Sequence, residues 1–593
     1  MRPPDAAIVT PPLCALELPQ LGPPTLQGFA ASRGLAVEHL DLNVGFRKHL
    51  RDKIELEVLD NPAGQQSPRP VLETLLLYFT DRFVARLGAQ PSYAAPYLGW
   101  SASGQCIEQL NPEAGSGLGY GGVVNAPPEI LAKFVRDRTL NYYHQYLDES
   151  RQAEAMAERY PLVGFSLMAP TQVVPALTLA ARLKELRPEL PIVLGGPWVS
   201  LFAAELAAAT PLRPFFDVVV EGEGEVPFIE LVRTREPERW SEIPNAWVKR
   251  GESLPRPRRS FVADLAELAT PSYDGLDLDA YVAPRPVLLQ SSRGCYWGRC
   301  AFCVHTFQAH AAETPRVRLR PLELVAADIE QLISRYAPRY LAFGDVSISP
   351  ARMKQLCQLM LDRHLTLPWF AFVRLDRGFD RPLLETMRRA GCLKLNFGLE
   401  SGSARILGLL EKGHDLGTAR RIIDDALDLG FRVTLHTMAA LPGETRADFE
   451  QTLALIEHYA PRIHETATEV FRLERGTRIF QSPQSYQIEI RDAGKSFDNS
   501  IPFDNLHGLG QGEAMTLLNE RLYGFYQGRD DLIYRAKSNV GLRHKDDFAT
   551  PSRFRARCRL RLGGVDFDEQ VTVSTGGGGI LTQLASSEEH GHA

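Results

Sequence analysis

Short apolar runs alternate with longer amphipathic stretches along most of the chain, and this alternation predicts the strands and helices of a parallel α/β protein. In the first third, the stretch from Val174 to Leu186 places its apolar residues on one helical face. The predicted strands of this part are Ala6 to Val9, Ala36 to Leu40, Leu162 to Ser166, Pro191 to Leu194 and Asp217 to Val220. Together they predict a Rossmann-like α/β domain over residues 1–243.

Residues 50–155 interrupt this pattern and are predicted to form a helical insertion. Two helices are expected in it, at Val71 to Leu87 and at Pro128 to Leu147. The aromatic residues of the second helix could line a substrate cap, although aromatic side chains at helical spacing more often pack in a core. These residues are Phe134, Tyr142, Tyr143 and Tyr146.

Strand and helix patterns alternate again in residues 285–485, after a linker at 244–284 that is rich in Pro, Asp and Gly. The repeat predicts a parallel α/β barrel of the TIM type, or part of one. The strands are expected at Val287 to Gln290, Tyr340 to Gly344, Trp369 to Arg374, Leu393 to Gly398, Arg432 to Ala440 and Glu465 to Leu473. In such barrels the chemistry lies at the carboxyl ends of the strands.

Residues 486–593 are predicted to form a small α+β domain. A helix is expected at Glu513 to Tyr526, and arginines alternate with apolar residues before a turn at Gly563-Gly564. A two-residue hairpin turn would place Arg561 opposite Asp566 and Arg559 opposite Asp568. We interpret this basic face as cross-strand ion pairing rather than as a phosphate or leader-peptide site. The stretch from Gly576 to Gly579 and the C-terminal tail are expected to be flexible.

Size and composition limit the classes of function. A chain of 593 residues is expected to hold three or more domains. A formal net charge of -6 gives no reason to expect nucleic acid or an anionic membrane as a partner. No apolar run is long enough to span a bilayer, and the N-terminus lacks the order of a signal peptide, so the sequence predicts a cytoplasmic protein.

Three cysteines, Cys295, Cys300 and Cys303, lie within nine residues. Three thiolates at this density can hold three irons of a cubane 4Fe-4S cluster while the fourth iron stays open to another ligand. A zinc site is the alternative, with His305 two residues further on, but it needs a fourth ligand. Disulfides are not expected with only eight cysteines in the chain and no sign of export.

The cysteine segment resembles the radical S-adenosylmethionine (SAM) enzymes. Arg293 and Gly294 lead into the first cysteine, and Phe302 stands directly before the last one. The commonest spacing of the family has three residues between the first two cysteines, whereas this chain has four, Tyr296-Trp297-Gly298-Arg299, as in a subset with an aromatic-rich insert. The resemblance implies a partial (β/α)6 barrel in which the open iron binds the amino and carboxylate groups of SAM, beside Phe302.

The same resemblance implies SAM-binding residues at the ends of the predicted barrel strands. Asp345 would be a shortened form of the family carboxylate that orients the amino group of SAM. Glu400 and Ser401 would bind its ribose and amino acid, because a carboxylate accepts two hydrogen bonds from paired hydroxyls. Gly443 would lie against adenine. The alternative for Glu400 is a surface charge at a helix N-terminus.

Arg374 ends the third predicted barrel strand and has two interpretations. It could bind the SAM carboxylate or a cobalamin propionamide. A structural salt bridge with Asp376 or Asp380 is an equal alternative, since both carboxylates are close in sequence.

Glycine-rich turns follow the predicted strands of the first domain. Ligands bind along the carboxyl edge of open α/β sheets, although such glycines can also serve only tight turns. The order of these turns resembles the cobalamin-binding domain of cobalamin-dependent radical SAM enzymes. The contacts that this resemblance implies are Pro12, Gln20, Ser166, Thr171, Gly195, Gly196, Pro197, Glu223 and Gly224. No Asp-x-His-x-x-Gly motif occurs, so Thr171 or a neighbour, rather than a histidine, is expected to face the lower side of the cobalt.

The sequence therefore predicts a cobalamin-dependent radical SAM enzyme whose cofactors are a 4Fe-4S cluster, SAM and cobalamin. The resemblance implies methylation of an unactivated carbon of a small metabolite or a peptide, with electrons from a reductase such as flavodoxin or ferredoxin. One alternative keeps the cofactors for cyclisation, ring contraction or hydration. Another is a non-enzymatic iron-sulfur or zinc scaffold.

Overall fold

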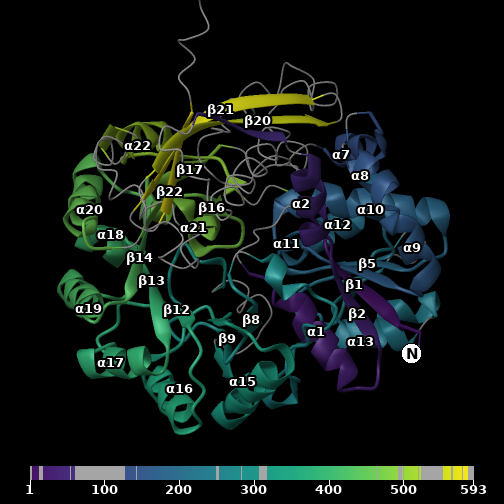
Figure 1. Ribbon diagram of the computed structural model, residues 1–593, viewed down its shortest axis with the longest axis horizontal. Coiled ribbons are helices and arrows are strands. Elements are labelled where there is room, and N and C mark those ends of the chain that lie inside the picture. The colour runs from purple at the N-terminus through teal and green to yellow at the C-terminus, as the bar shows by residue number, and fades with distance from the viewer. Residues whose placement is uncertain are drawn as a thin grey trace, which may run out of the picture.

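The structure of the protein is a computed structural model (Figure 1). It describes residues 3–12, 18–53, 55–60, 127–139, 141, 143–234, 236–248, 253–281, 283–305, 317–463, 465–491, 497, 500–518, 520–521, 552–562, 565–576 and 579–584. Figure 1 shows two large α/β units side by side, one purple to blue and the other teal to green. No helix in these ranges is long and apolar enough to cross a membrane.

The first unit is a twisted sheet in the order β2-β1-β4-β5-β6-β7. Its strands are β1 (Ala6–Thr10), β2 (Val37–Asp41), β4 (Val163–Ser166), β5 (Ile192–Gly195), β6 (Val218–Val220) and β7 (Ala246–Trp247). The first five are parallel and lie where the apolar runs predict them, whereas β7 is antiparallel and extends the domain into the predicted linker. The predicted Rossmann-like fold is confirmed.

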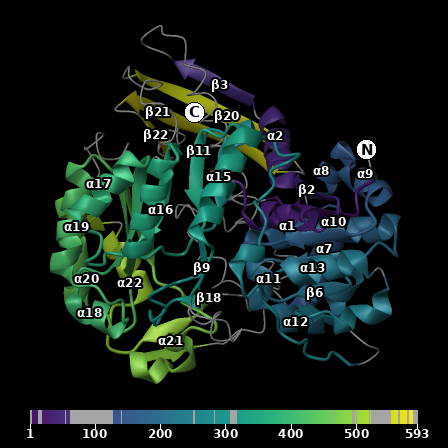
Figure 2. The same cartoon turned by 90° about the horizontal axis from the view of Figure 1, so that it is seen from below.

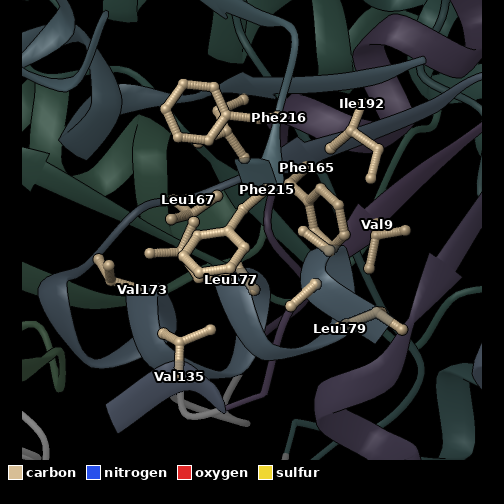
Figure 3. Close-up of a cluster of buried hydrophobic side chains, with 14 of the residues drawn as sticks. Val9, Val135, Phe165, Leu167, Val173, Leu177, Leu179, Ile192, Phe215 and Phe216 are labelled. Atoms are coloured by element: carbon tan, nitrogen blue, oxygen red, sulfur yellow. The ribbon is translucent and has the colours of Figure 1, made fainter. Parts of the chain in front are cut away.

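Helices cover both faces of this sheet because its strands are apolar on both sides. On one face pack α1 (Gly22–Ala31) and α13 (Glu225–Arg233). On the other pack α2 (Leu42–Lys53) and α10 (Val173–Leu186), together with the helices of the insertion. Figure 3 shows the core of this second face, where strand residues such as Phe165 meet Leu177 of α10.

The described part of the insertion differs from its prediction. Instead of one helix it contains α7 (Pro128–Arg136), α8 (Tyr143–Ser150) and α9 (Gln152–Arg159), which pack into the core of the first unit. Phe134, Tyr143 and Tyr146 are each at most 2% exposed, so they are core residues and the substrate-cap interpretation is wrong for them. Tyr142 and the predicted helix Val71 to Leu87 lie outside the described residues.

The second unit is a parallel sheet in the order β15-β14-β13-β12-β11-β8. Its strands are β8 (Pro286–Leu289), β11 (Tyr340–Phe343), β12 (Trp369–Val373), β13 (Cys392–Glu400), β14 (Arg432–Ala439) and β15 (Glu465–Val470). The helices α15 (Leu322–Tyr336), α16 (Pro350–Asp362), α17 (Arg381–Arg389), α18 (Ala404–Leu409), α19 (Leu416–Asp428) and α20 (Arg446–Tyr459) connect the strands and lie on the outside (Figure 1). Since β8 and β15 do not pair with each other, the predicted partial barrel is confirmed.

The C-terminal sheet has the order β22-β21-β20-β3. In the register of the hairpin of β20 (Ser552–Leu562) and β21 (Val565–Gly576), Arg561 lies opposite Asp566 and Arg559 opposite Asp568, as predicted, whereas ion pairing between them stays a prediction. Gly576 and Gly579 form the last pair of β21 with β22 (Gly579–Leu584), and the flexibility expected of this stretch stays a prediction. Of the predicted helix Glu513 to Tyr526, the structure describes α22 (Gln511–Leu518).

The strand β3 (Glu55–Asp60) was not predicted from the sequence. It lies in the region assigned to a helical insertion, yet it pairs antiparallel with β20 at the far end of the chain. Figure 2 shows the purple strand β3 beside the yellow strands β20 and β21, along one side of the molecule. Residues from the first and last parts of the chain therefore build one sheet.

Candidate active site

The cysteine segment lies at the carboxyl end of the barrel strands. It follows β8 and the short strand β9 (Ser292–Gly294), which pairs with β10 (Val317–Leu319) in an antiparallel ribbon. Cys295 forms a parallel bridge with Ser347, which follows β11. Cys300 is 8% exposed, and Cys295 and Cys303 are half-buried. None of the three forms a disulfide, and the Cys303 amide donates to the Cys300 carbonyl at 3.2 Å.

The donor set fits a cubane better than a single ion. Among the described residues, no group of three or more His, Cys, Asp or Glu side chains is arranged to hold one metal ion. In a cubane each cysteine binds a different iron, so its sulfurs need not converge on one point. Burial raises the pKa of the Cys300 thiol, while the nearby Lys412 and Arg374 lower it in part.

The four-residue insert between the first two cysteines docks the segment onto the barrel. The Trp297 indole donates to the Glu411 carbonyl at 2.9 Å, and the Tyr296 hydroxyl donates to Asp376. A Cβ on Gly413 would lie 2.0 Å from the Trp297 ring, and Gly413 has a φ of +79°. Glycine is therefore required at position 413. The four-residue insert is held on the barrel by the Trp297 ring packed against this glycine.

Arg374 contacts the cysteine segment directly. Its Nη1 lies 3.8 Å from Cys300 Sγ, and its Nε lies 3.2 Å from Asp376 Oδ2. The salt bridge predicted with Asp376 is confirmed, whereas Asp380 instead caps α17 by accepting from the Leu383 amide at 3.0 Å. A contact of Arg374 with SAM or cobalamin stays a prediction.

Asp345 is buried and faces the cysteine segment from the end of β11. It accepts hydrogen bonds from the Ser291 amide and hydroxyl, both at 2.9 Å, and from the Ser292 hydroxyl at 2.5 Å. Both carboxylate oxygens thus hold the turn that leads into Arg293 and the cysteines. The predicted contact of Asp345 with the SAM amino group is untested, and its observed contacts position the loop.

Glu400 is buried at the end of β13, which excludes the surface-charge alternative. It pairs with Lys412, whose Nζ lies 2.6 Å from Glu400 Oε1. A register shift precedes Glu400, its φ is +67°, and a Cβ on Gly398 would lie 2.6 Å from its carboxylate. A non-glycine residue in this conformation costs about 1–3 kcal/mol, and such strain is typical of functional sites.

Ser401 points the other way. Its side chain is fully buried, and its hydroxyl lies 3.2 Å from the Thr452 hydroxyl and accepts from the Ser403 amide at 3.1 Å. The structure therefore separates Ser401 from the face that carries Glu400. Its contacts hold α20 against the end of β13, and its role toward SAM stays a prediction.

Gly443 lies in the turn after β14 with a φ of +68°. Its amide donates to Asn505 Oδ1 at 2.9 Å, and its carbonyl accepts from Arg405 at 2.6 Å. The amide and the carbonyl of Gly443 therefore both fix this turn, which suits a surface that would support the adenine ring. Its contact with adenine stays a prediction.

Glu444, next in the chain, is fully buried. Burial, together with the charge of Asp448, raises its pKa to about 8. Because the unfolded side chain titrates near 4.5, the protonated carboxyl stabilises the fold fully below that pH, and this contribution is lost as the pH rises toward 8.

We expect Glu444→Gln to remove this loss of folding stability, which has a slope of at most about 1.4 kcal/mol per pH unit. Denaturant unfolding between pH 4.5 and pH 8 measures this change in the pH dependence of stability. Glu385 is an exposed carboxylate on α17, and Glu385→Gln should leave the pH dependence unchanged.

The carboxyl edge of the first sheet has the close backbone approaches expected of a large ligand's site. Gly196 has a φ of +103°, and a Cβ there would lie 2.5 Å from the Leu167 carbonyl. Gln20 donates to Gln172 at 3.2 Å, and Gln172 donates to the Pro11 carbonyl at 2.9 Å, so the loops after β1 and β4 are tied together.

The other predicted cobalamin contacts lie along the same edge with different exposures. Ser166, Thr171 and Pro12 are buried, Gly195 is half-buried at the end of β5, and Pro197 is exposed at the start of α11 (Pro197–Leu201). On the loop after β4, Met168 is 49% exposed, whereas Thr171 is 7% exposed. The edge thus fits a bulky ligand, and Met168 presents more surface to it than the predicted Thr171.

Glu223 forms ion pairs with two arginines of the second unit, and its predicted contact with cobalamin stays a prediction. It pairs with Arg293 at 3.1 Å and with Arg318, while Glu225 pairs with the same Arg293. Arg293 and Arg318 lie opposite each other in the β9–β10 ribbon. The carboxylates of Glu223 and Glu225 therefore contact a surface that carries two arginines. Burial raises the pKa of Glu223, but the Arg318 hydrogen bond and the charges of Arg293 and Arg318 outweigh it, and the net pKa is lowered.

This four-charge cluster, Arg293, Arg318, Glu223 and Glu225, joins the two units at their carboxyl edges. All four side chains are between 6% and 21% exposed. Gly344 after β11 belongs to the same boundary, because a Cβ there would lie 2.7 Å from Leu21 of the first unit. Gly224 lies between the two glutamates at the start of α13, against Leu26. The edge of the first sheet therefore faces the cysteine segment.

Sequence reasoning missed Arg318, Glu225 and Lys412. The only signals were two acidic residues flanking Gly224 and arginines on both sides of the cysteine segment. The ion pairs of Arg318 and Glu225 join the two units, and Lys412 reaches Glu400 across 12 residues of the chain, so no local pattern shows these pairs.

Comparison with known proteins agrees with this arrangement. Residues 289–456 match the radical SAM superfamily, and residues 130–232 match the B12 binding domain. The chain thus contains a radical SAM domain and a B12 binding domain, the two domains that occur together in cobalamin-dependent radical SAM enzymes. The cofactors of these enzymes are a 4Fe-4S cluster, SAM and cobalamin.

Relatives and solved structures give the same picture. An uncharacterized methyltransferase of Pyrococcus horikoshii is 29% identical over 47% of this chain and 60% of its own length. The anaerobic magnesium-protoporphyrin IX monomethyl ester cyclase of Cereibacter sphaeroides is 22% identical over 64% of this chain and 62% of its own length. The chain thus spans less than two thirds of both.

Two solved folds align over most of the chain. The radical SAM methyltransferase TsrM of Kitasatospora setae, with cobalamin and a 4Fe-4S cluster bound, has a TM-score of 0.53, 16% identity, and coverage of 86% of this chain and 84% of its own. The cobalamin-dependent SAM radical enzyme OxsB has a TM-score of 0.55, 12% identity, and coverage of 89% and 67%. At these identities the similarity is one of fold.

Proposed function

We propose that this protein is a cobalamin-dependent radical SAM enzyme that methylates an unactivated carbon of a small molecule or a peptide. The observation that carries the proposal is the contact of the two carboxyl edges through the four-charge cluster. It brings the loop that would hold the iron-sulfur cluster and the edge that would hold cobalamin to one boundary.

The residues divide the work between the two cofactors. When bound, the cluster supplies one-electron cleavage of SAM to start radical chemistry, and cobalamin supplies a transferable methyl group. Cys295, Cys300 and Cys303 would hold three irons and leave the fourth for SAM. Glu400, held by Lys412, would accept hydrogen bonds from SAM, and the Gly443 turn would support its ring.

The cellular setting follows from this chemistry. A low-potential cluster needs an external electron donor and a reducing compartment, so we place the enzyme in the cytoplasm with a flavodoxin or a ferredoxin as its reductase.

A second candidate keeps the cofactors but transfers no methyl group. The similarity to the Cereibacter cyclase favours it, since that name describes ring formation. Product analysis distinguishes the two. Methylation yields S-adenosylhomocysteine beside 5'-deoxyadenosine and methionine, whereas a non-methylating reaction yields 5'-deoxyadenosine and methionine without S-adenosylhomocysteine.

The test is anaerobic preparation with iron, sulfide and cobalamin, followed by iron and corrinoid counts and by SAM cleavage under dithionite. We expect a 4Fe-4S cluster and one corrinoid per chain. A protein that binds the cluster but no corrinoid would contradict the cobalamin-dependent reaction.

We expect Glu400→Gln to weaken SAM binding by about 10- to 100-fold, since a charged hydrogen bond contributes about 1.5–3 kcal/mol. Anaerobic calorimetry of the reconstituted protein measures this. Glu411→Gln is the matched control, because Glu411 is a nearby carboxylate paired with Arg478 at the surface, where it is 46% exposed. Equal affinities for SAM in wild type and Glu400→Gln would contradict the assignment.

A further inference from the structure

The Cys300 side of the cysteine segment carries two buried cations. Arg374 is 5% exposed and Lys412 is 6% exposed. Arg374 Nη1 donates to Cys300 Sγ at 3.8 Å, a hydrogen bond to one of the three sulfurs that would hold iron. Lys412 Nζ lies 5.7 Å from the centre of the Phe302 ring, within the same segment. Both cations act on Cys300 by their charge, and of the two Arg374 contacts its sulfur, while Lys412 is paired with Glu400.

The guanidinium of Arg374 is held on several sides. Its Nε and Nη2 contact the two Asp376 oxygens at 3.2 and 3.4 Å, and Nη2 also donates to the Lys412 carbonyl. Trp297 stacks against it, with its ring centre 4.7 Å from Cζ. Rotation toward another ligand would break these contacts, so the planar group keeps Nη1 on the sulfur.

These contacts also explain the spacing of the cysteines. Trp297 belongs to the four residues between Cys295 and Cys300, and its ring fills the space above Gly413. The longer spacing thus supplies the aromatic surface that fixes the guanidinium. A shorter loop would leave Arg374 held by Asp376 and a carbonyl alone.

Hydrogen bonds to cluster sulfurs and nearby charges are among the features that set the reduction potential of an iron-sulfur cluster. Reduction adds one negative charge to the cluster, and a cation in a buried site stabilises that charge more strongly than one in water. Two carboxylates oppose these cations: Asp376 contacts Arg374 on the side of the guanidinium away from Cys300, and Glu400, paired with Lys412, also acts on Cys300 by its charge.

We propose that Arg374 raises the reduction potential of the cluster through its hydrogen bond to Cys300, and that Trp297 and Asp376 hold it in that position. The proposal rests on the proposed function, because it requires the cluster. It makes Arg374 a positioning residue that acts on the cluster through Cys300, in place of a ligand of the SAM carboxylate.

The test is an EPR-monitored redox titration of the reconstituted cluster without SAM. In Arg374→Gln, the ratio of reduced to oxidised cluster at a fixed donor potential should fall about tenfold, which is 59 mV for one electron. Arg374→Lys keeps the charge but loses the planar group, so its fall should be smaller. Arg377→Gln is the matched control. It removes the same charge three residues further along the chain, and the Arg377 side chain is 87% exposed.

The outcomes separate the two proposals. A wild-type protein that forms no 4Fe-4S cluster would overturn the proposed function. A cluster whose potential is the same in wild type and Arg374→Gln, or that shifts equally in Arg377→Gln, would overturn the role of Arg374. If Arg374→Gln binds no iron, Arg374→Lys decides, because a potential equal to wild type in that variant contradicts the proposal.

Discussion

Replacement of Cys300 by alanine should remove the iron-sulfur cluster and abolish SAM cleavage, the largest effect that we expect from any single substitution. Three thiolates leave no spare ligand, so the loss of one leaves two irons open and the cluster unstable. The same result is expected for Cys295→Ala and Cys303→Ala. Iron and sulfide counts after anaerobic reconstitution measure the loss, and far-UV circular dichroism reports whether the fold is kept.

Cys357→Ala is the matched control for this experiment. Cys357 is fully buried in the barrel core, away from the cysteine segment, and its pKa is raised by burial alone. Its replacement should cost about 1 kcal/mol of stability and leave the iron count unchanged. A Cys300→Ala protein with a complete cluster and undiminished SAM cleavage would show that these sulfurs are not the ligands.

Arg293→Gln should destabilise the contact between the two units, the second largest effect. The guanidinium is 13% exposed and neutralises both Glu223 and Glu225, so its removal leaves a buried carboxylate without a partner. Breaking a buried ion pair in this way costs about 3–5 kcal/mol. Since Arg293 lies two residues before Cys295, we expect weaker retention of both cobalamin and iron.

Denaturant unfolding and corrinoid content after desalting measure these changes. Arg462→Gln is the control, because Arg462 also bridges two carboxylates, Asp424 and Asp428, but all three are 44–55% exposed. A surface pair contributes about 1 kcal/mol or less. If Arg293→Gln and Arg462→Gln lower the free energy of unfolding by the same amount, the four-charge cluster does not hold the two units together.

The strands of both sheets could be predicted from the sequence because each is a short apolar run between turn residues, and local patterns carry this information. The register of the β20–β21 hairpin followed from counting outward from Gly563-Gly564. The opposite directions of Glu400 and Ser401 could not be predicted in this way. They depend on a register shift in β13 and on the left-handed φ of Glu400, which alternation along a strand does not show.

Contacts between distant segments were also beyond the sequence. The ion pairs of Arg293 join residues about 70 positions apart, and Glu223 alone suggested a loop residue at a ligand-binding edge. Asp345 was expected to contact SAM because it follows a barrel strand, but its position also suits the serines of the next turn. Position at a strand end identifies candidates, and only side-chain partners show which of them are already engaged.

The pairing of β3 with β20 has a consequence for synthesis of the protein. At about 5–20 residues per second, a ribosome needs roughly 25 to 100 s to make the nearly 500 residues between them. Over that interval β3 is an open edge that could join the strand of another nascent chain. Its exposed Glu55 and Glu57 repel such neighbours until Arg559, 3.4 Å from Glu57 in the finished protein, arrives.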